Sequence, residues 1–375
     1  MAAHATDGLM QNNTDPVLFW IGLSGVPGVG RVTFRKLVKQ FGSPQRALAA
    51  SVDELTGAGG LARKVADAIR SFAWREHAER ELTKASENGI DIITLDDPAY
   101  PYNLRDTPDP PLFLYIKGML KPEDGSAVAL VGTRKPTHYG KTVTLRLAGE
   151  LASSGFTVVS GLARGIDTQA HRGALAARGR TIAVLGCGID VVYPPENRAL
   201  MEEIGGSGAV VTENPFGTKP ESGYFPARNR IISGLARGTV IIEASEDSGS
   251  LITAQYALDQ GRKLFAVPGN VGSPVSRGTH NLIKEGATLV EGTNDILAGL
   301  GAGPSGGSRP AARPLPPLTL DEAAVLKCMT NEPKHIDVLM NESRIAAGAL
   351  SGALINLELK GLAKQLPGKY FVRED

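Results

Sequence analysis

The sequence predicts an α/β protein with a doubly wound sheet, because two kinds of segment alternate along most of its 375 residues. Six short runs rich in valine and isoleucine occur between residues 127 and 269, and five of them end in glycine or a polar residue. Stretches with the periodicity of helices separate these runs. Strands that are apolar throughout are buried on both faces, as in parallel sheets covered by helices.

This alternation predicts a Rossmann-like fold, in which ligands bind outside the carboxyl ends of the parallel strands. The expected strands are residues 127–132, 156–161, 181–186, 208–213, 239–244 and 263–269. The expected helices are residues 141–155, 167–179, 195–205, 227–238 and 250–261. Functional residues are therefore sought just after each strand.

Changes in composition divide the chain into four parts. Residues 15–78 have the pattern of short helices, and residues 79–300 contain the Rossmann-like core. Residues 301–317 are rich in glycine, proline and serine, which predicts a flexible linker. Residues 318–375 form a small last domain.

The first domain contains a helix-hairpin-helix pattern. The stretch "LSGVPGVGRVTFRKLVKQFGS" (23–43) places Gly28 and Gly30 in a tight turn before a helix, where backbone N–H groups could face a DNA phosphate. The stretch at 55–69 has the form of a degenerate second copy. A helical packing domain without DNA contact fits the same residues.

The last domain has the pattern of a winged helix. Three helical stretches precede a β-hairpin that turns at Pro367 and Gly368. No lysine or arginine lies between Ile345 and Leu359 on the third helix, where a DNA reader would need them. We therefore favour a protein contact or a structural accessory over groove reading.

Composition excludes several classes of protein. No apolar run reaches the roughly 18 residues that span a membrane, and the N-terminus shows no secretory signal. Cys187 and Cys328 lie in different expected domains, which argues against a disulfide framework or a zinc site and favours a reducing cytoplasm. The net charge is +1, but residues 125–240 hold 13 Lys/Arg against 8 Asp/Glu, a modest attraction for a polyanion.

The string "SGLARG" occurs twice, with different neighbours. The first copy, Ser160 to Gly165, follows an expected strand and precedes a helix near Asp167. Gly161 lets backbone amides approach a ligand, Arg164 adds positive charge, and Asp167 is placed to cap the helix. We interpret this copy as an anion site, although a tight turn without a ligand also fits.

The second copy, Ser233 to Gly238, ends a helix and leads into a strand. Gly238 is expected to be the C-cap of that helix, with Arg237 complementing the helix dipole. The same six residues therefore predict a site in one place and a helix end in the other.

Two further strand ends carry arginine. Gly132 and Arg134 follow the strand 127–132, and a helix is expected near His138. The third glycine of GxGxxG is absent there, which argues against a standard dinucleotide site, whereas an arginine suits a phosphate.

The stretch "FPARNR" places Arg228 and Arg230 around Asn229 at the expected start of a helix near Ala227. These residues could hold a phosphodiester, and Phe225 or Tyr224 could stack on a base. Alternatively, the arginines pair with carboxylates such as Glu213 or Glu243 and hold the sheet. Ser248 and Ser250 open another helix and form a further candidate anion cradle.

The sequence gives little support to catalysis. Asp167 and His171 are four residues apart and could form an acid/base dyad, with Glu213 and Glu243 as further acids. A capping aspartate and a histidine on the helix surface explain the pair more simply. No nucleophile elbow, P-loop lysine motif or metal-ligand cluster occurs, so we expect a binding protein without a cofactor.

Taken together, these stretches closely resemble the DNA-processing protein A family (DprA, also called Smf). The resemblance is densest over residues 98–297. It is carried by "YPYNLRDTPDPPLFLYIKG", "VGTRKPTHYG", "VSGLARGIDTQAHRGAL", "GCGIDVVYPPEN", "TENPFG", "FPARNRIISGLARG", "IIEASEDSGSLITAQYALDQGR", "FAVPGN" and "SRGTHNLIKEGA".

The resemblance implies a nonenzymatic protein that binds single-stranded DNA entering by natural transformation and protects it. It also implies loading of RecA recombinase onto that DNA, displacement of single-strand-binding protein, and a homodimer formed through the Rossmann-like domain.

The resemblance also implies site residues. Arg134 matches the family's DNA-contacting arginine, and the other matches fall in the SGxARGID loop, the FPxRNR segment and the SGSLIT helix start. These are Ser160, Gly161, Arg164, Arg228, Asn229, Arg230, Ser248 and Ser250. Many relatives carry a basic residue where this chain has Pro195, and Arg198 is a candidate substitute.

The sequence leaves two other functions open. The same glycine-rich loops could serve a nucleotide or nucleoside-phosphate hydrolase with Glu243 or Asp167 as acid/base. They could also form a nucleotide-sensing module that signals through the winged helix.

Overall fold

The computed structural model describes residues 16–303, 316–330 and 332–373. The described residues form two compact units, one of residues 16–135 and 144–303 and the other of residues 136–143, 316–330 and 332–373. Most of the expected linker at 301–317, and the N-terminus judged free of a secretory signal, lie outside the described residues. No helix in the described ranges is long and apolar enough to cross a membrane.

The centre of the first unit is a nine-stranded sheet within the described residues, with the order β1-β2-β6-β5-β4-β3-β7-β8-β9. The neighbours from β6 to β9 are parallel, whereas β1 and β2 join the edge antiparallel. The strands are β1 (Asp91–Thr94), β2 (Phe113–Gly118), β3 (Ala127–Val131), β4 (Thr157–Ser160), β5 (Thr181–Val184), β6 (Ala209–Thr212), β7 (Gly238–Ile241), β8 (Lys263–Ala266) and β9 (Thr288–Leu289).

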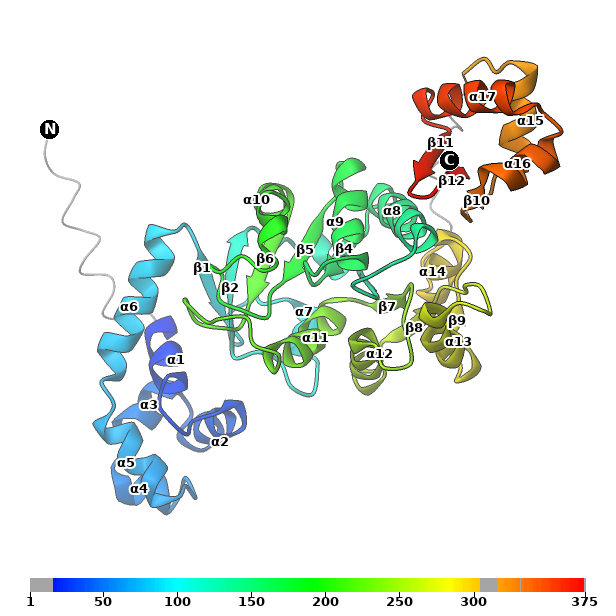
Figure 1. Cartoon of the computed structure of the whole chain (residues 1–375). Helices are drawn as coiled ribbons and strands as arrows, with labels where there is room; N and C mark the ends of the chain where they lie inside the picture. Colours follow the sequence, from blue (N-terminus) through cyan, green and yellow to red (C-terminus); the bar gives the residue numbers. More distant parts are fainter. Residues whose placement is uncertain (1–15, 304–315, 331, 374–375) are drawn as a thin grey trace, which may run out of the picture. The chain divides into compact units, whose positions relative to one another are not determined.

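The doubly wound, Rossmann-like prediction is confirmed, and each of the six expected strands is present. Figure 1 shows one layer of helices on each side of the sheet. One layer contains α8 (His138–Ser153), α9 (Ile166–Ala176) and α10 (Arg198–Ser207). The other contains α11 (Tyr224–Leu235), α12 (Gly249–Asp259) and α13 (Arg277–Lys284), with α7 (Tyr102–Arg105) nearby and α14 (Thr293–Gly299) after β9.

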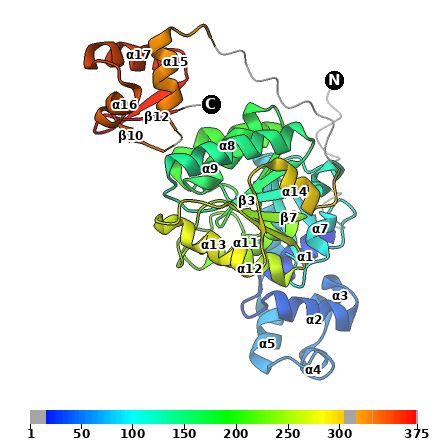
Figure 2. The ribbon, with the colours of Figure 1, turned by 90° about the vertical axis from the view of Figure 1, so that its right-hand side faces the viewer.

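The turned view in Figure 2 shows the α8–α9 pair and the α11–α12 pair on opposite sides of β3 and β7. Central strands such as β3 and β4 are buried at every residue. Burial on both faces explains why their sequences are apolar without alternation.

The N-terminal helices form the expected tandem of hairpins. The first joins α1 (Pro16–Ser24) to α2 (Arg31–Phe41), and the second joins α4 (Val52–Thr56) to α5 (Arg63–Ser71), with α3 (Pro44–Ala49) between them. A last helix, α6 (Trp74–Glu87), runs across the expected domain boundary at residue 78. One apolar core continues from these helices into the sheet face under α10, which explains why the tandem belongs to the same compact unit.

Ion pairs also tie the first hairpin to the core. Arg31 binds Glu213 at 3.1 Å and Asp109 at 3.1 Å, and Arg35 binds Asp109 at 2.8 Å. Arginines that begin the helix after Gly30 are therefore neutralised by carboxylates of the core. A DNA contact at this hairpin stays a prediction.

The winged-helix prediction is also confirmed. The domain has its own core, which includes Val325, Leu339 and Phe371. Gly368, with φ of 82°, makes the expected hairpin turn. The elements are α15 (Leu320–Cys328), β10 (Lys334–His335), α16 (Ile336–Ser343), α17 (Ala347–Leu359), β11 (Ala363–Leu366) and β12 (Tyr370–Arg373).

The second copy of SGLARG corrects one prediction. Helix α11 ends at Leu235 with Ala236 as its C-cap, so Gly238 is not the cap and instead begins β7. A Cβ on Gly238 would lie 2.8 Å from the Phe265 ring, which explains the glycine by packing. Arg237 donates to the carbonyl of Leu300 at 2.9 Å, at the end of another helix.

Candidate functional site

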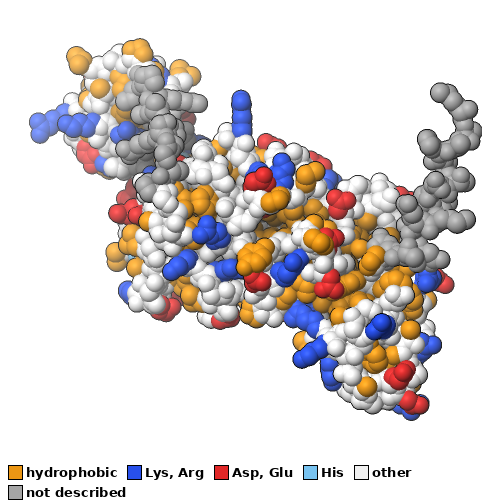
Figure 3. Space-filling model, turned by 180° about the vertical axis from the view of Figure 1, so that it is seen from behind, with side chains coloured by type: hydrophobic (Ala, Val, Ile, Leu, Met, Phe, Trp, Pro, Cys, Tyr) orange, Lys and Arg blue, Asp and Glu red, His pale blue; other side chains and the backbone are white. Residues whose placement is uncertain are grey.

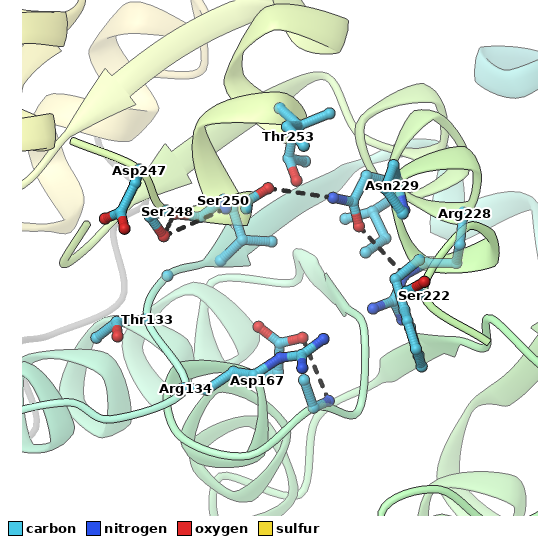
Figure 4. Close-up of a pocket in the computed structure, with 18 of the residues that line it drawn as sticks. Thr133, Arg134, Asp167, Ser222, Arg228, Asn229, Asp247, Ser248, Ser250 and Thr253 are labelled. Carbon is cyan, nitrogen blue, oxygen red and sulfur yellow. Dashed lines mark hydrogen bonds between the residues drawn. The ribbon is translucent and has the colours of Figure 1, made fainter. Parts of the chain in front are cut away.

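A cleft of about 690 Å³ lies outside the carboxyl ends of β3, β4 and β7. The chain adds β4, β5 and β6 on one side of β3 and then returns to add β7 and β8 on its other side, so the cleft lies at the point where the strand order reverses. Its walls come from the loops after these three strands and from the starts of α11 and α12 (Figure 4). The cleft therefore lies where the sequence predicts the site, outside the carboxyl ends of the parallel strands.

Arg134 is an exposed arginine of the cleft. It is exposed on the loop after β3, and its guanidinium lies 5.3 Å from the centroid of the Phe225 ring. Among the described residues it makes no hydrogen bond or ion pair. Gly132 fixes the course of this loop, because a Cβ there would lie 2.7 Å from the side chain of Ile166. An exposed, unpaired arginine on a rigid loop can bind a phosphate without first breaking an ion pair.

Phe225 forms an aromatic wall beside Arg134. Its ring is tilted by 37° against Tyr193, with 5.5 Å between the ring centroids. Gly186 leaves room for the ring, because a Cβ there would lie 2.9 Å from it. Arginine and a ring together suit a nucleotide, which presents a phosphate and a flat base.

The first SGLARG copy does not offer the expected cradle of free amides. The Asp167 carboxylate accepts from the backbone N–H groups of Gly161 at 3.2 Å and Ala163 at 3.3 Å, so it already occupies them. Asp167 therefore does not cap α9, whose N-cap is Gly165 without a side-chain bond. Ser160 is buried and donates to the Leu130 carbonyl at 2.7 Å. These residues build the floor of the site.

Arg228 is also part of this floor. It is 5% exposed and donates to the carbonyls of Gly161 and Val184, at the ends of two neighbouring strands. Burial lowers its pKa, against the opposing effect of Asp167, and burial likewise raises the pKa of Asp167. A Cβ on Gly161 would overlap the guanidinium, so the glycine is needed for this packing. Arg228 lines the cleft but is committed to holding strand ends together.

Arg230 lies on the other side of α11 and does not line the cleft. It is 4% exposed and binds Glu213 and Asp109, as the alternative interpretation of this segment expected. Asn229, between the two arginines, does line the cleft, and its Nδ2 donates to the Gly249 carbonyl at 3.3 Å. Residues two apart on a helix point in different directions, so the structure does not bring Arg228 and Arg230 together.

Two further expected arginines differ in position. Arg164 is exposed beside the aromatic wall, but its guanidinium is paired with the Glu196 carboxylate, also exposed. That pairing lowers the pKa of Glu196 and raises that of Arg164. Arg198 is the first residue of α10, is exposed, and is not among the residues that line the cleft.

The start of α12 forms the wall opposite Arg134. Ser248 is the N-cap, and its Oγ lies 2.8 Å from the Oγ of Ser250 and accepts from the Ser250 amide at 3.4 Å. Asp247 lines the same wall, and its Oδ1 accepts from the Ser245 hydroxyl at 2.7 Å. The expected anion cradle therefore has a carboxylate at its mouth.

The expected acid/base groups do not form a catalytic pair. His171 is fully buried, not on the helix surface, and its Nδ1 lies 2.7 Å from the Thr181 hydroxyl. Burial lowers its pKa to about 3, so the ring is neutral. Glu243 is buried, and Glu213 binds Arg31 and Arg230. Within the described ranges, no group of three or more His, Cys, Asp or Glu is placed to hold a metal.

Lys135, Tyr193 and Asp247 are among the residues of the cleft that the sequence did not single out. Each lies within one of the sequence stretches quoted above for the family resemblance. Its position in such a stretch is the only feature of the sequence that points to the cleft. Figure 3 shows the molecule from behind relative to Figure 1. Basic and acidic side chains are interspersed on that face, which agrees with the small net charge of the chain.

Comparison with known proteins supports one family. The family model described as DNA recombination-mediator protein A matches residues 91–301. A DprA winged helix domain matches residues 309–369, and a SAM-like helix-hairpin-helix tandem matches residues 21–75.

Individual relatives agree. Protein Smf of Synechocystis is 35% identical over 95% of this chain and 98% of its own length. DNA processing protein DprA of Bacillus subtilis is 42% identical over 62% of this chain and 80% of its own.

Two solved structures are also similar. That of DNA processing protein A from Streptococcus pneumoniae has a TM-score of 0.67 at 34% identity, covering 76% of this chain and 97% of the other. The one from Helicobacter pylori has a TM-score of 0.51 at 34% identity, covering 56% of this chain and 95% of the other, and is described as giving insight into the single-stranded DNA binding mode of that protein.

Proposed function

Because the chain belongs to the DNA-processing protein A (DprA/Smf) family, we propose that it binds single-stranded DNA in the cleft at the carboxyl ends of β3, β4 and β7. The observation that carries the proposal is the exposed Arg134 guanidinium 5.3 Å from the Phe225 ring centroid. The arginine is placed for a backbone phosphate, and the ring for a base.

The proposed contacts divide into two groups by what their side chains already bind. Arg134, Phe225, Asn229 and the Ser248–Ser250 pair face the cleft and could contact the strand directly, and Gly132 sets the Arg134 loop. Ser160, Gly161 and Arg228 position the floor through bonds inside the protein.

The remaining three expected arginines differ in whether they could contact the strand. Arg164 would contribute after leaving Glu196. Arg230 is committed to the core carboxylates, so we leave it out of the contact set. A contact by Arg198 stays a prediction, since it lies outside the cleft.

We further propose the family's role as a recombination mediator. In this role the protein would protect incoming single strands during natural transformation and load RecA recombinase onto them in place of single-strand-binding protein. A homodimer in the cytoplasm would place two clefts on one particle. Family membership is the support for these points.

A binding role fits the site better than hydrolysis. The Asp167 carboxylate is engaged by two backbone amides, and His171 is buried against Thr181. A general base must reach the proton it removes, and neither group is free to do so. We therefore propose a nonenzymatic protein.

The test is fluorescence anisotropy of a labelled oligo-dT with the full chain, over a salt series and with duplex competitor. We expect tight, single-strand-preferring binding that weakens steeply with salt. Arg134→Ala should lower the affinity about 10-fold, equal to about 1.4 kcal/mol, and reduce the magnitude of the salt slope by about 0.7.

Arg172→Ala is the matched control, because Arg172 is exposed on α9 and does not line the cleft. Its affinity should equal that of the wild type. Absence of binding by the wild type at moderate salt would reject the proposal. Equal losses in the two variants would reject the cleft as the binding site.

A further inference from the structure

The two long walls of the cleft carry opposite charge. Arg134 and Lys135 are exposed on the loop after β3. Asp247 is exposed on the loop after β7, beside the hydroxyls of Ser245 and Ser248. Figure 4 shows Arg134 below the cleft, with Asp247, Ser248 and Ser250 above it. A ligand that fits both walls must be anionic on one side and donate hydrogen bonds on the other.

The Asp247 carboxylate is held as an acceptor. The Ser245 hydroxyl donates to its Oδ1 at 2.7 Å, and this bond, with one from its own amide, lowers its pKa. No other donor among the described residues bonds to this side chain. Each carboxylate oxygen has two lone pairs, so Oδ2 and the second lone pair of Oδ1 retain accepting capacity at the edge of the cleft.

Charge fixes how a single strand would lie between these walls. The phosphates are attracted to Arg134 and Lys135 and repelled by Asp247. The bases must then point toward the α12 wall, where hydroxyls and the Asp247 carboxylate meet their edges.

A carboxylate accepts hydrogen bonds and cannot donate them, so it distinguishes bases by their donors. Guanine presents N1–H and an N2 amino group side by side, and these two donors match the two oxygens of a carboxylate. Adenine and cytosine each present one amino group beside a ring nitrogen that accepts. Thymine presents a single N3–H between two carbonyl oxygens, which the carboxylate repels.

We propose that Asp247 reads the base edge of a bound single strand and gives the cleft a preference for guanine. This inference rests on the proposed function, because it requires single-stranded DNA in the cleft. It goes beyond that function by assigning a specificity-determining residue and the base that it selects.

The test compares labelled single strands of equal length in which every fourth thymine of an oligo-dT is replaced by one other base, a spacing that does not make the strand self-complementary. The replacing base is guanine, hypoxanthine (deoxyinosine) or adenine, and pure oligo-dT is included. Isolated guanines avoid quadruplexes, and deoxyinosine keeps N1–H and O6 but lacks the N2 amino group. Anisotropy is measured with the full chain at one salt concentration.

The wild type should bind the guanine strand roughly fivefold more tightly than the adenine strand, near the lower end of the range for a bidentate base contact. The deoxyinosine strand should fall between them. Asp247→Asn should reduce the difference between guanine and adenine below twofold. Glu246→Gln is the matched control, because Glu246 is the neighbouring exposed carboxylate and does not line the cleft, and it should keep the preference.

The outcomes separate the inference from the function on which it rests. If the wild type binds all strands equally, or if Asp247→Asn keeps the guanine preference, base reading by Asp247 is overturned while strand binding stands. If the wild type binds none of the strands, both proposals fail. Equal thermal unfolding temperatures for the three proteins would exclude a folding defect as the cause.

Discussion

Replacing Phe225 by leucine tests whether the aromatic wall contributes to binding through its ring. Leucine keeps an apolar side chain but removes the surface on which a base can stack. Base–aromatic stacking contributes about 1–3 kcal/mol per base, and an exposed cation–π contact about 0.5–1 kcal/mol. One base would stack on the ring, and the Arg134 guanidinium lies 5.3 Å from the ring centroid. We therefore expect Phe225→Leu to reduce the binding free energy by about 2 kcal/mol, which raises Kd roughly 30-fold.

The same structure predicts that Phe225 and Arg134 are coupled. If the ring positions the guanidinium, Phe225→Leu already misplaces Arg134, and the double variant loses less than the sum of the two single losses. We expect a coupling energy of about 0.5–1 kcal/mol from a double-mutant cycle. Phe225→Tyr, which keeps the ring, is the matched control and should bind nearly as well as the wild type.

The assay is anisotropy with oligo-dT at one fixed salt concentration for the four proteins of the cycle and the tyrosine variant. Circular dichroism checks that each variant is folded. Wild-type affinity in Phe225→Leu would show that no base stacks at this wall. Strict additivity with Arg134→Ala would show that the ring does not position the arginine.

Two further predictions concern a surface ion pair and a buried histidine. Glu196→Gln should free Arg164 for a phosphate and tighten oligo-dT binding about two- to fivefold. Glu202→Gln is the control and should leave the affinity unchanged, because Glu202 pairs with Lys117 elsewhere on the surface. Unchanged or weaker binding by Glu196→Gln would remove Arg164 from the contact set. Burial lowers the pKa of His171 from 6.5 to about 3, so between these values the unfolded chain binds a proton that the folded protein does not. The free energy of unfolding should therefore fall as the pH drops below about 6.5, by up to about 1.4 kcal/mol per unit, and urea titrations at pH 5 and pH 7 should show a smaller difference for His171→Gln.

The sequence predicted the central strands well because their position in the sheet determines their composition. A strand buried on both faces must be apolar at every residue, as β3 and β4 are. The two antiparallel strands, β1 at one edge of the sheet and β2 beside it, were not predicted, for a related reason. β1 is only partly buried, and β2 pairs with β6, about a hundred residues away, so no local alternation with helices indicates them.

The structure brings the expected strand ends to one cleft, but it does not bring every expected residue into that cleft. Strand ends fixed the place, because parallel strands bring their carboxyl ends to one edge. The geometry of α11 could also have separated Arg228 from Arg230, because each helical residue turns the side-chain direction by about 100°. No sequence pattern shows that the Asp167 carboxylate accepts from the backbone amides of the loop before it, because that contact depends on how the buried side chain packs in the folded protein.

The two copies of SGLARG show why a short string does not determine a site. In the second copy Leu235 is the last residue of a helix, whereas in the first Leu162 adopts a positive φ of 57°, a conformation unfavourable for leucine. The first loop is held in that conformation from outside the string, because Asp167 binds its amides and Arg228 binds the carbonyl of Gly161. The binding capacity of the first copy therefore belongs to the sheet edge that supplies these partners, and the same six residues without them form a helix end.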